Sequence, residues 1–194
     1  MSEDQLGGRL QLLDRSGLSS AQATLWDKMN ADIGSWADKI GFKAKTADGR
    51  LIGPFNPMLR SPDIARSFQQ LQEAEGEHTS LSDRVRQVVI LSVGSVWKAP
   101  YDLYAHSAAA RHAGFSDACV EALAAGASSS ELSAQEAVAQ RLALALTAAH
   151  AVEESLYTEA LQQFGEKGLV DLAVLAGCYH LVCGVLTLFA VPAP

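Results

Sequence analysis

Apolar residues recur every three to four positions along most of the chain, which is the period of a helix that buries one face. Within residues 20–40 the apolar stripe consists of Leu25, Met29, Ile33, Trp36 and Ile40. Residues 83–97 are rich in β-branched side chains, so a strand fits this segment as well as a helix. Since no other segment favours a strand, the pattern predicts an all-α protein, most simply a helical bundle.

Capping signals divide this pattern into separate helices. Ser61 and Pro62 stand in the preferred order of an N-cap and a first-turn residue, and they predict a helix that continues to about Ala74. Ser80 and Asp83 resemble a capping box at the start of the ambiguous segment. Further helices are expected over residues 101–112, 117–126, 137–150, 156–164 and 167–190, with caps or breaks at Ser116, Ser133, Ser155 and Gly165.

Residues 41–62 form a long connection that glycine and proline interrupt repeatedly. The Asp48-Gly49 pair predicts a turn there, which a short hairpin would accommodate. Connections of this length are usually lids or binding loops, so we expect this one to border a site.

Composition and charge narrow the class of protein. Of the 194 residues 48% are hydrophobic and 19% are charged, which indicates a globular chain. The net charge of −7 argues against a nucleic-acid partner, because neutralising phosphates requires a basic surface. The acidic, polar N-terminus is unlike a signal peptide, and three cysteines without a familiar spacing read as reduced thiols, so we expect a cytoplasmic protein.

The C-terminal segment, residues 169–191, is apolar and long enough to span a membrane. It nevertheless contains Asp171, His180 and two glycines, and it is the only such segment. We therefore expect no membrane association and interpret it as a buried helix at an interface between subunits.

Asp102 and His106 are the most prominent candidates for chemistry. They stand four residues apart on a predicted helix, which places them on one face. A carboxylate beside an imidazole raises the imidazole pKa and fixes its orientation, as a general acid/base requires. A surface ion pair or a structural core histidine explains the same spacing.

The segment around this pair resembles the carboxymuconolactone decarboxylase / alkylhydroperoxidase D (AhpD-like) superfamily. The usual pattern of the family is Cys-x-x-Cys-x-x-x-His followed by a small-residue helix that ends in Ala-Gly-[Leu/Phe/Val]-Ser. This chain has Ala99, Asp102 and His106 at the corresponding positions, and then reads AGFS at residues 113–116. A non-redox branch of the family, with Glu-Tyr-Glu-Trp-x-x-His in place of the cysteines, is similar. The resemblance extends over about residues 45–194.

The resemblance implies an AhpD-like, oligomeric helical bundle, often a trimer or a hexamer. The domain would comprise residues 46–194, preceded by an N-terminal helical arm at residues 1–45. Because Ala99 and Asp102 replace the two thiols, a dithiol–disulfide cycle is excluded at these positions. Gln87 occupies the position of the family's acid, and a glutamine hydrogen-bonds without relaying a proton at neutral pH.

The function implied is a cofactor-independent, carboxymuconolactone decarboxylase-like enzyme, without a metal, that acts on a small carboxylated or lactone-type organic acid. His106 would transfer the proton, Asp102 would orient it, and Tyr101 or His180 would bind the substrate, with His180 facing His106 across the pocket. At most one of Arg84 and Arg86 can face the site; our candidates for a carboxylate anchor are Arg84 and Arg60. A non-catalytic AhpD-like binding or assembly protein is the alternative, and a peroxidase is a third interpretation.

Overall fold

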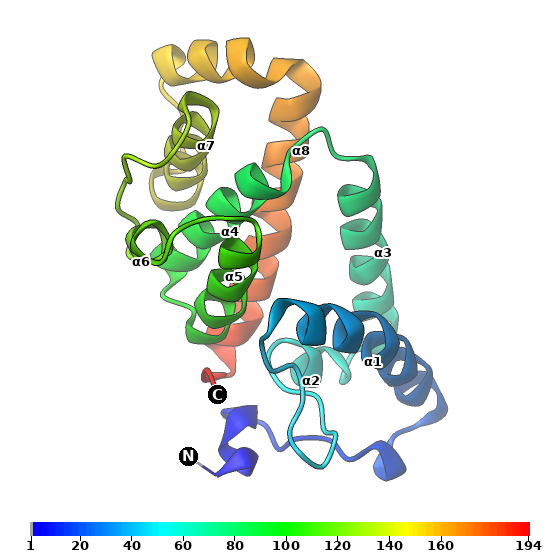
Figure 1. Cartoon of the computed structure of the whole chain (residues 1–194). Coiled ribbons are helices and arrows are strands. Elements are labelled where there is room, and N and C mark those ends of the chain that lie inside the picture. The colour runs from blue at the N-terminus through cyan, green and yellow to red at the C-terminus, as the bar shows by residue number, and fades with distance from the viewer. Residues whose placement is uncertain (1) are drawn as a thin grey trace.

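The structure, a computed structural model that describes residues 2–194, confirms the all-α prediction (Figure 1). Apart from one isolated antiparallel bridge between Lys45 and Leu51, no strand pairing occurs within those residues. In chain order the elements are η1 (Glu3–Gly7), η2 (Arg15–Gly17), α1 (Ser20–Ile40), α2 (Phe55–Met58), α3 (Pro62–His78), α4 (Asp83–Trp97), α5 (Pro100–His112), α6 (Asp117–Ala124), α7 (Ala134–Leu144), the π-helical turn η3 (Ala145–Ala149) and α8 (Glu154–Leu188).

Helix α4 is the centre of the bundle and packs against α5, α6, α7 and α8. Every residue from Val88 to Gly94 is buried, so the middle of the helix is enclosed on all sides. This resolves the ambiguity of the 83–97 segment. A helix surrounded by other helices tolerates β-branched residues around its whole circumference, because packing outweighs their modest strand preference.

Helices α1, α2 and α3 form a second group beside the bundle (Figure 1). α1 packs on α3 and on α5, and α3 also contacts α8, so the two groups meet along α5 and α8. The connection at residues 41–62 holds the Lys45–Leu51 bridge and the short helix α2. The division of the chain at residue 45 stays a prediction.

Several predicted helix ends need correction. The N-cap of α4 is Ser82, whose side chain accepts a hydrogen bond from the Val85 amide at 3.3 Å, and not Ser80. Helix α8 begins after Glu153, where we expected Ser155, and α3 continues four residues beyond Ala74. The amide and hydroxyl of Ser80 instead donate to Oδ2 of Asp171 on α8, a long-range contact that the local capping pattern does not contain.

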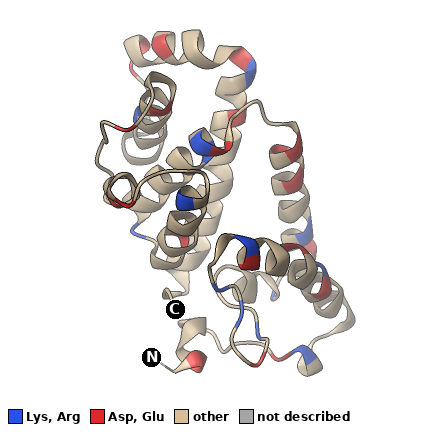
Figure 2. Cartoon of the chain, in the orientation of Figure 1, with Lys and Arg blue, Asp and Glu red and all other residues tan. Residues whose placement is uncertain are grey.

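Charged side chains concentrate on α1, α3 and the first part of α8 (Figure 2). Residues 172–194 contain no Asp, Glu, Lys or Arg. Gly165, at φ 64° and ψ 176°, kinks α8 where the sequence predicts a break between two helices. By length and composition α8 is long and apolar enough to cross a membrane, and 39% of its most apolar stretch is buried inside the protein.

Candidate functional site

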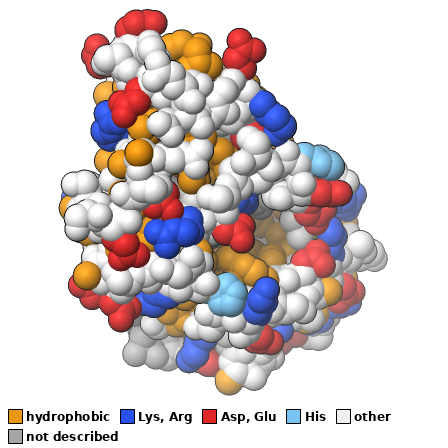
Figure 3. All heavy atoms as spheres, turned by 45° about the horizontal axis from the view of Figure 1, so that its top comes forward, with side chains coloured by type: hydrophobic (Ala, Val, Ile, Leu, Met, Phe, Trp, Pro, Cys, Tyr) orange, Lys and Arg blue, Asp and Glu red, His pale blue; other side chains and the backbone are white. Residues whose placement is uncertain are grey.

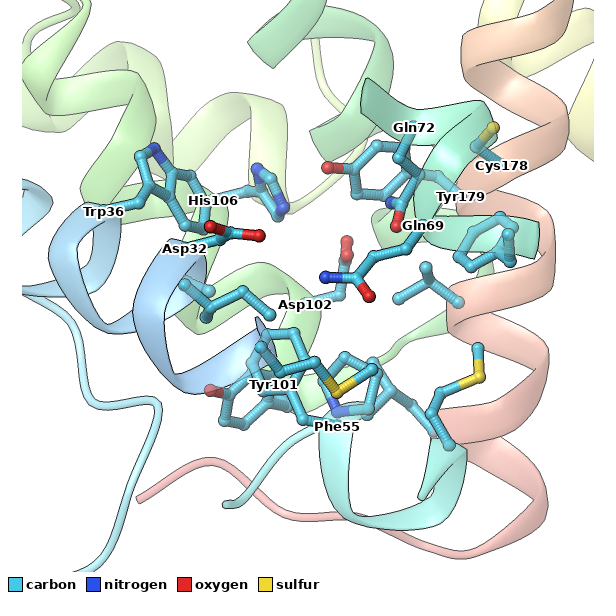
Figure 4. A pocket seen from close by; sticks show the side chains of 18 of the residues that line it. Asp32, Trp36, Phe55, Gln69, Gln72, Tyr101, Asp102, His106, Cys178 and Tyr179 are labelled. Carbon is cyan, nitrogen blue, oxygen red and sulfur yellow. The ribbon is translucent and has the colours of Figure 1, made fainter. Parts of the chain in front are cut away.

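A cavity of about 410 Å³ lies where the two groups of helices meet. Its walls come from α1, α2, α3, α5 and α8, and most of the side chains that line it are apolar. The space-filling view shows a hollow with hydrophobic atoms in its depth and charged side chains around it (Figure 3). Among the polar residues of the cavity, Figure 4 labels Asp32, Gln69, Gln72, Asp102, His106, Cys178 and Tyr179.

His106 enters the cavity from α5, and Gln87 of α4 fixes its orientation. The Nδ1 atom of His106 lies 2.9 Å from Oε1 of Gln87. Because a carbonyl oxygen only accepts, Nδ1 carries the proton and Nε2 keeps a free lone pair. Burial lowers the pKa of His106 to about 3, and the positive charge of Arg86 acts in the same direction. The imidazole is therefore neutral at pH 7.

Asp102 lines the same cavity but does not orient His106, which corrects the expected pairing. Its Oδ2 is buried without a hydrogen-bond partner among residues 2–194. Gly94 makes room for it, since a Cβ at that position would overlap Oδ2. Burial raises the pKa of Asp102 to about 8, while the nearby thiol of Cys183 opposes this shift. The carboxyl is therefore mostly protonated at pH 7, so it is an acid and not an anionic partner.

The arginine at the cavity is Arg86, not Arg84 or Arg60. Arg86 forms an ion pair with Glu75 of α3, whose side chain is 5% exposed. Arg84 instead donates to Glu136 at 2.6 Å, and Arg60 donates to the carbonyl oxygen of Gln11 at 2.7 Å. Neither of these two lines the cavity, since each is held by a partner elsewhere.

Tyr101 contributes its ring to the cavity wall, but its hydroxyl is already used. It donates a hydrogen bond to the carbonyl oxygen of Lys43 at 2.8 Å, and so anchors the connection to α5. In Figure 4 this hydroxyl points away from the middle of the cavity. Tyr101 therefore shapes the site without offering a polar group to it.

The prediction that His180 faces His106 is wrong. Its Nε2 lies 3.1 Å from the hydroxyl of Thr147, on the side of α8 that contacts η3. The neighbouring Tyr179 occupies the predicted place, with its ring centroid 4.9 Å from that of His106 at an interplanar angle of 88°. Since consecutive residues of a helix point about 100° apart, only one of the pair can reach the cavity.

Sequence reasoning missed the contribution of α3. Gln69, Gln72 and Glu75 recur at intervals of three and share a face with the apolar Phe68, and all four line the cavity. The sequence did contain a signal for this contribution, since these polar residues lie on the same helix face as an apolar residue. Polar side chains on a buried face require hydrogen-bond partners, so their presence there indicates a site.

A second, more polar cavity of about 490 Å³ adjoins the first. Trp36, Arg86, His106 and Tyr179 line both cavities. These four residues therefore form the wall that the largely apolar cavity shares with the more polar one.

Within residues 2–194, no three His, Cys, Asp or Glu side chains are grouped so that they could hold a metal ion. The three cysteines are free and buried. Burial raises the thiol pKa of both Cys178 and Cys183, so neither side chain favours the thiolate form.

Comparisons with known proteins agree with this fold. Residues 62–154 match the model of the carboxymuconolactone decarboxylase family. This match, together with AhpD-like solved structures, supports the resemblance to the carboxymuconolactone decarboxylase / AhpD-like superfamily that the sequence predicted. No curated protein matches the chain in a sequence search.

Solved structures with the same fold cover nearly the whole chain. An uncharacterized peroxidase-related protein from Ralstonia eutropha JMP134, described as an alkylhydroperoxidase AhpD core, is 16% identical with a TM-score of 0.75, over 97% of this chain and 93% of that one. A peroxidase-related protein from Silicibacter sp. TM1040 is 18% identical with a TM-score of 0.73, over 100% and 95%. A variant of the debrominase Bmp8 in complex with 2,3,4-tribromopyrrole is 15% identical with a TM-score of 0.71, over 100% and 94%. At these identities the likeness establishes the AhpD-like fold.

Proposed function

We propose that this chain is a cofactor-independent acid–base enzyme of the carboxymuconolactone decarboxylase type. It transfers a proton within a small carboxylated or lactone-type organic acid, by a proton shift or coupled to loss of CO2. One observation carries the proposal: a neutral imidazole and a protonated carboxyl line one largely apolar cavity. Pairs of titratable groups whose surroundings drive their pKa values apart are typical of acid–base sites.

His106 is the base in this proposal. Its Nε2 lone pair is free because Gln87 holds the proton on Nδ1. Gln87 is therefore a positioning residue, which selects the tautomer without exchanging a proton with the substrate. The rings of Trp36 and Tyr179, at 5.9 Å and 4.9 Å from the imidazole, limit the directions from which a substrate can approach.

Asp102 is the acid. A protonated carboxyl donates a hydrogen bond to a carbonyl or enolate oxygen, so it stabilises the negative charge that develops when a carbon loses a proton or CO2. In a lactone the proton passes from carbon to Nε2 of His106 while Asp102 donates to the carbonyl oxygen. Return of the first proton to a different carbon, and of the second to Asp102, restores both groups and completes the shift.

A thiol-peroxidase reaction fits this cavity poorly. Cys178 lines the cavity, but a thiol whose pKa is raised by burial is a weak nucleophile at neutral pH. The Ralstonia relative is described as peroxidase-related, but that description applies to the relative and does not make the buried thiols of this chain better nucleophiles.

The proposal is tested by hydrogen exchange and turnover on a panel of muconolactone-type acids and unsaturated lactones. Proton NMR in D2O detects exchange at carbon, and CO2 release detects decarboxylation. His106→Gln should lower the rate by about 10²–10⁴-fold, as is typical for loss of a general base. His180 lies on the side of α8 that faces away from the cavity, so His180→Gln is the matched control and should retain the rate. If the wild type exchanges no proton on any compound, or if both variants behave alike, the proposal fails; binding without turnover would favour a non-catalytic protein.

A further inference from the structure

The charge balance of the cavity constrains what it can bind. The one arginine among its lining residues is Arg86, and its charge is compensated by the buried Glu75 carboxylate. His106 contributes no positive charge at pH 7, because its imidazole is neutral. A ligand anion would therefore meet no uncompensated cation among the residues that line the cavity.

The mouth of the cavity is acidic. Asp32 and Glu73, which line it on α1 and α3, share a single exposed cation, Lys28, at 3.0 Å and 2.6 Å. Two carboxylates and one ammonium leave negative charge in excess at this rim. An approaching anion is repelled here, and once inside it would be buried without a partner, which costs several kcal/mol.

Two buried polar groups in the cavity also lack partners. Oε1 of Gln69 and Oδ2 of Asp102 form no hydrogen bond among the described residues, and the two residues are 9% and 2% exposed. Figure 4 shows the Gln69 amide projecting from α3 toward the middle of the cavity. Buried polar atoms are almost always satisfied, so the unpaired oxygen of Gln69 on the wall of the cavity indicates a ligand that completes it.

The two groups require complementary atoms from that ligand. The Gln69 oxygen accepts a hydrogen bond and so needs a donor. With Oδ2 of Asp102 packed against Gly94, a ligand meets the carboxyl through Oδ1, and a neutral carboxyl can donate to an acceptor there. The remaining wall is apolar.

We propose that the cavity selects an uncharged, largely apolar small molecule that presents a hydrogen-bond donor to Gln69 and an acceptor to Asp102. This deepens, and rests on, the proposed function, since it names the substrate class of the same cavity. It favours an uncharged lactone that also carries a hydroxyl or amide donor over the free carboxylate, and hence a proton shift over decarboxylation. It also assigns a binding role to Gln69, which lies outside the Asp102–His106 segment.

Three ring compounds of almost the same shape separate the alternatives. Benzamide carries a donor and an acceptor, acetophenone carries only an acceptor, and benzoate is the anionic counterpart. Isothermal titration calorimetry at pH 7 on the full chain should show benzamide binding about tenfold more tightly than benzoate. Equal or tighter binding of benzoate, or no binding of any of the three compounds, overturns the inference.

Two variants assign the effect to named residues. Gln69→Leu should reduce the affinity for benzamide to that for acetophenone, because the N–H group of benzamide loses its hydrogen-bond acceptor. The affinity for acetophenone, which has no donor, should stay within about twofold of its wild-type value. Gln70 is exposed on the same helix, so Gln70→Leu is the matched control and should leave both affinities unchanged. Glu75→Gln, which leaves Arg86 uncompensated, should reverse the preference toward benzoate, and the Glu75→Gln/Arg86→Gln double variant should remove that reversal.

These results are independent of turnover. Gln69→Leu replaces a buried amide whose Oε1 makes no hydrogen bond, so it should fold even if the ion-pair variants do not. An unchanged ratio of benzamide to acetophenone affinity in Gln69→Leu overturns the assignment. An inactive wild type that still prefers benzamide would remove the proposed reaction and leave the binding inference intact, whereas a preference for benzoate would do the opposite.

Discussion

Replacing Asp102 by Asn should stabilise the protein at neutral pH, and the gain should disappear in acid. The side chains have nearly the same shape, but the amide is uncharged at every pH. In the folded protein burial raises the pKa of Asp102 from 3.8 to about 8. Below pH 3.8 the carboxyl is protonated in both the folded and the unfolded states, so the substitution changes little there.

The magnitude follows from linkage between protonation and folding. Between pH 3.8 and about 8 only the unfolded state ionises, so the wild type loses about 1.4 kcal/mol of unfolding free energy for each pH unit. At pH 7 the accumulated loss is on the order of 4 kcal/mol. The Asp102→Asn variant avoids this loss, which is large against the roughly 5–15 kcal/mol that stabilises a typical domain.

His106 has the opposite pH dependence, and this sharpens the expectation. Its pKa is lowered from 6.5 to about 3, so acidification through that window destabilises the fold. Between about pH 4 and 6.5 the slopes of His106 and Asp102 cancel, and above 6.5 only the loss from Asp102 remains. The combined contribution of these two groups to the unfolding free energy of the wild type is therefore level between about pH 4 and 6.5 and falls above pH 6.5.

Urea unfolding of the wild type and Asp102→Asn at half-unit steps from about pH 4 to 8 tests this, with the difference in unfolding free energy plotted against pH. Asp38→Asn, an exposed carboxylate on α1, controls for the change in net charge. A difference that stays constant across the range would refute the reasoning, because it would mean that the Asp102 carboxyl ionises in the folded protein as it does in the unfolded chain.

Three further predictions concern the rate, the packing and the assembly. Initial rates should fall above about pH 8, as Asp102 ionises and can no longer donate; a rate that stays level well above that pH would exclude it as the acid. Gly94→Ala drives a Cβ into the Asp102 carboxyl and should cost about 1–3 kcal/mol in urea unfolding together with activity, whereas Gly76→Ala, whose Cβ meets nothing nearer than 4.0 Å, should not destabilise the fold. Leu181→Glu on the exposed face of the C-terminal part of α8 should convert the proposed homo-oligomer to a smaller species in light scattering, while Tyr157→Glu, near the start of the helix, should not.

The last of these predictions rests on a regular exposed pattern. Alternating steps of four and three residues define the α8 seam, which consists of Val170, Val174, Gly177, Leu181, Gly184 and Leu188. Its four large side chains are all exposed in the single chain. A 3.5-residue apolar repeat is the pattern by which helices pack against one another, so a second subunit is the expected partner.

The helices were predictable because their signals are local. The apolar stripe of residues 20–40, the Ser133 capping box and the Gly165 break lie within one or two turns of the structure that they specify. The 83–97 segment stayed ambiguous because its state depends on burial by four other helices, which a single window of sequence does not contain.

The candidate site was less predictable because its contacts are long-range. Spacing placed Asp102 and His106 on one face of α5, and the structure puts both in the cavity. The spacing alone could not show that burial keeps both groups uncharged, nor that the hydrogen-bond partner of His106 is 19 residues away on α4. The Glu75–Arg86 pair joins two helices whose relative position the sequence did not define.

The contact between Gln87 and His106 explains how a glutamine can serve at this position. A glutamate there would also accept the Nδ1 proton of His106, but its negative charge would stabilise the imidazolium and raise the pKa of His106. Gln87 supplies the same geometry at 2.9 Å without the charge, so the imidazole stays neutral and its Nε2 lone pair stays free. The replacement of the family's acid therefore does not remove the orienting contact. It makes His106 a weaker base that is unprotonated in the resting protein at pH 7, and Asp102 is left as the group that donates a proton.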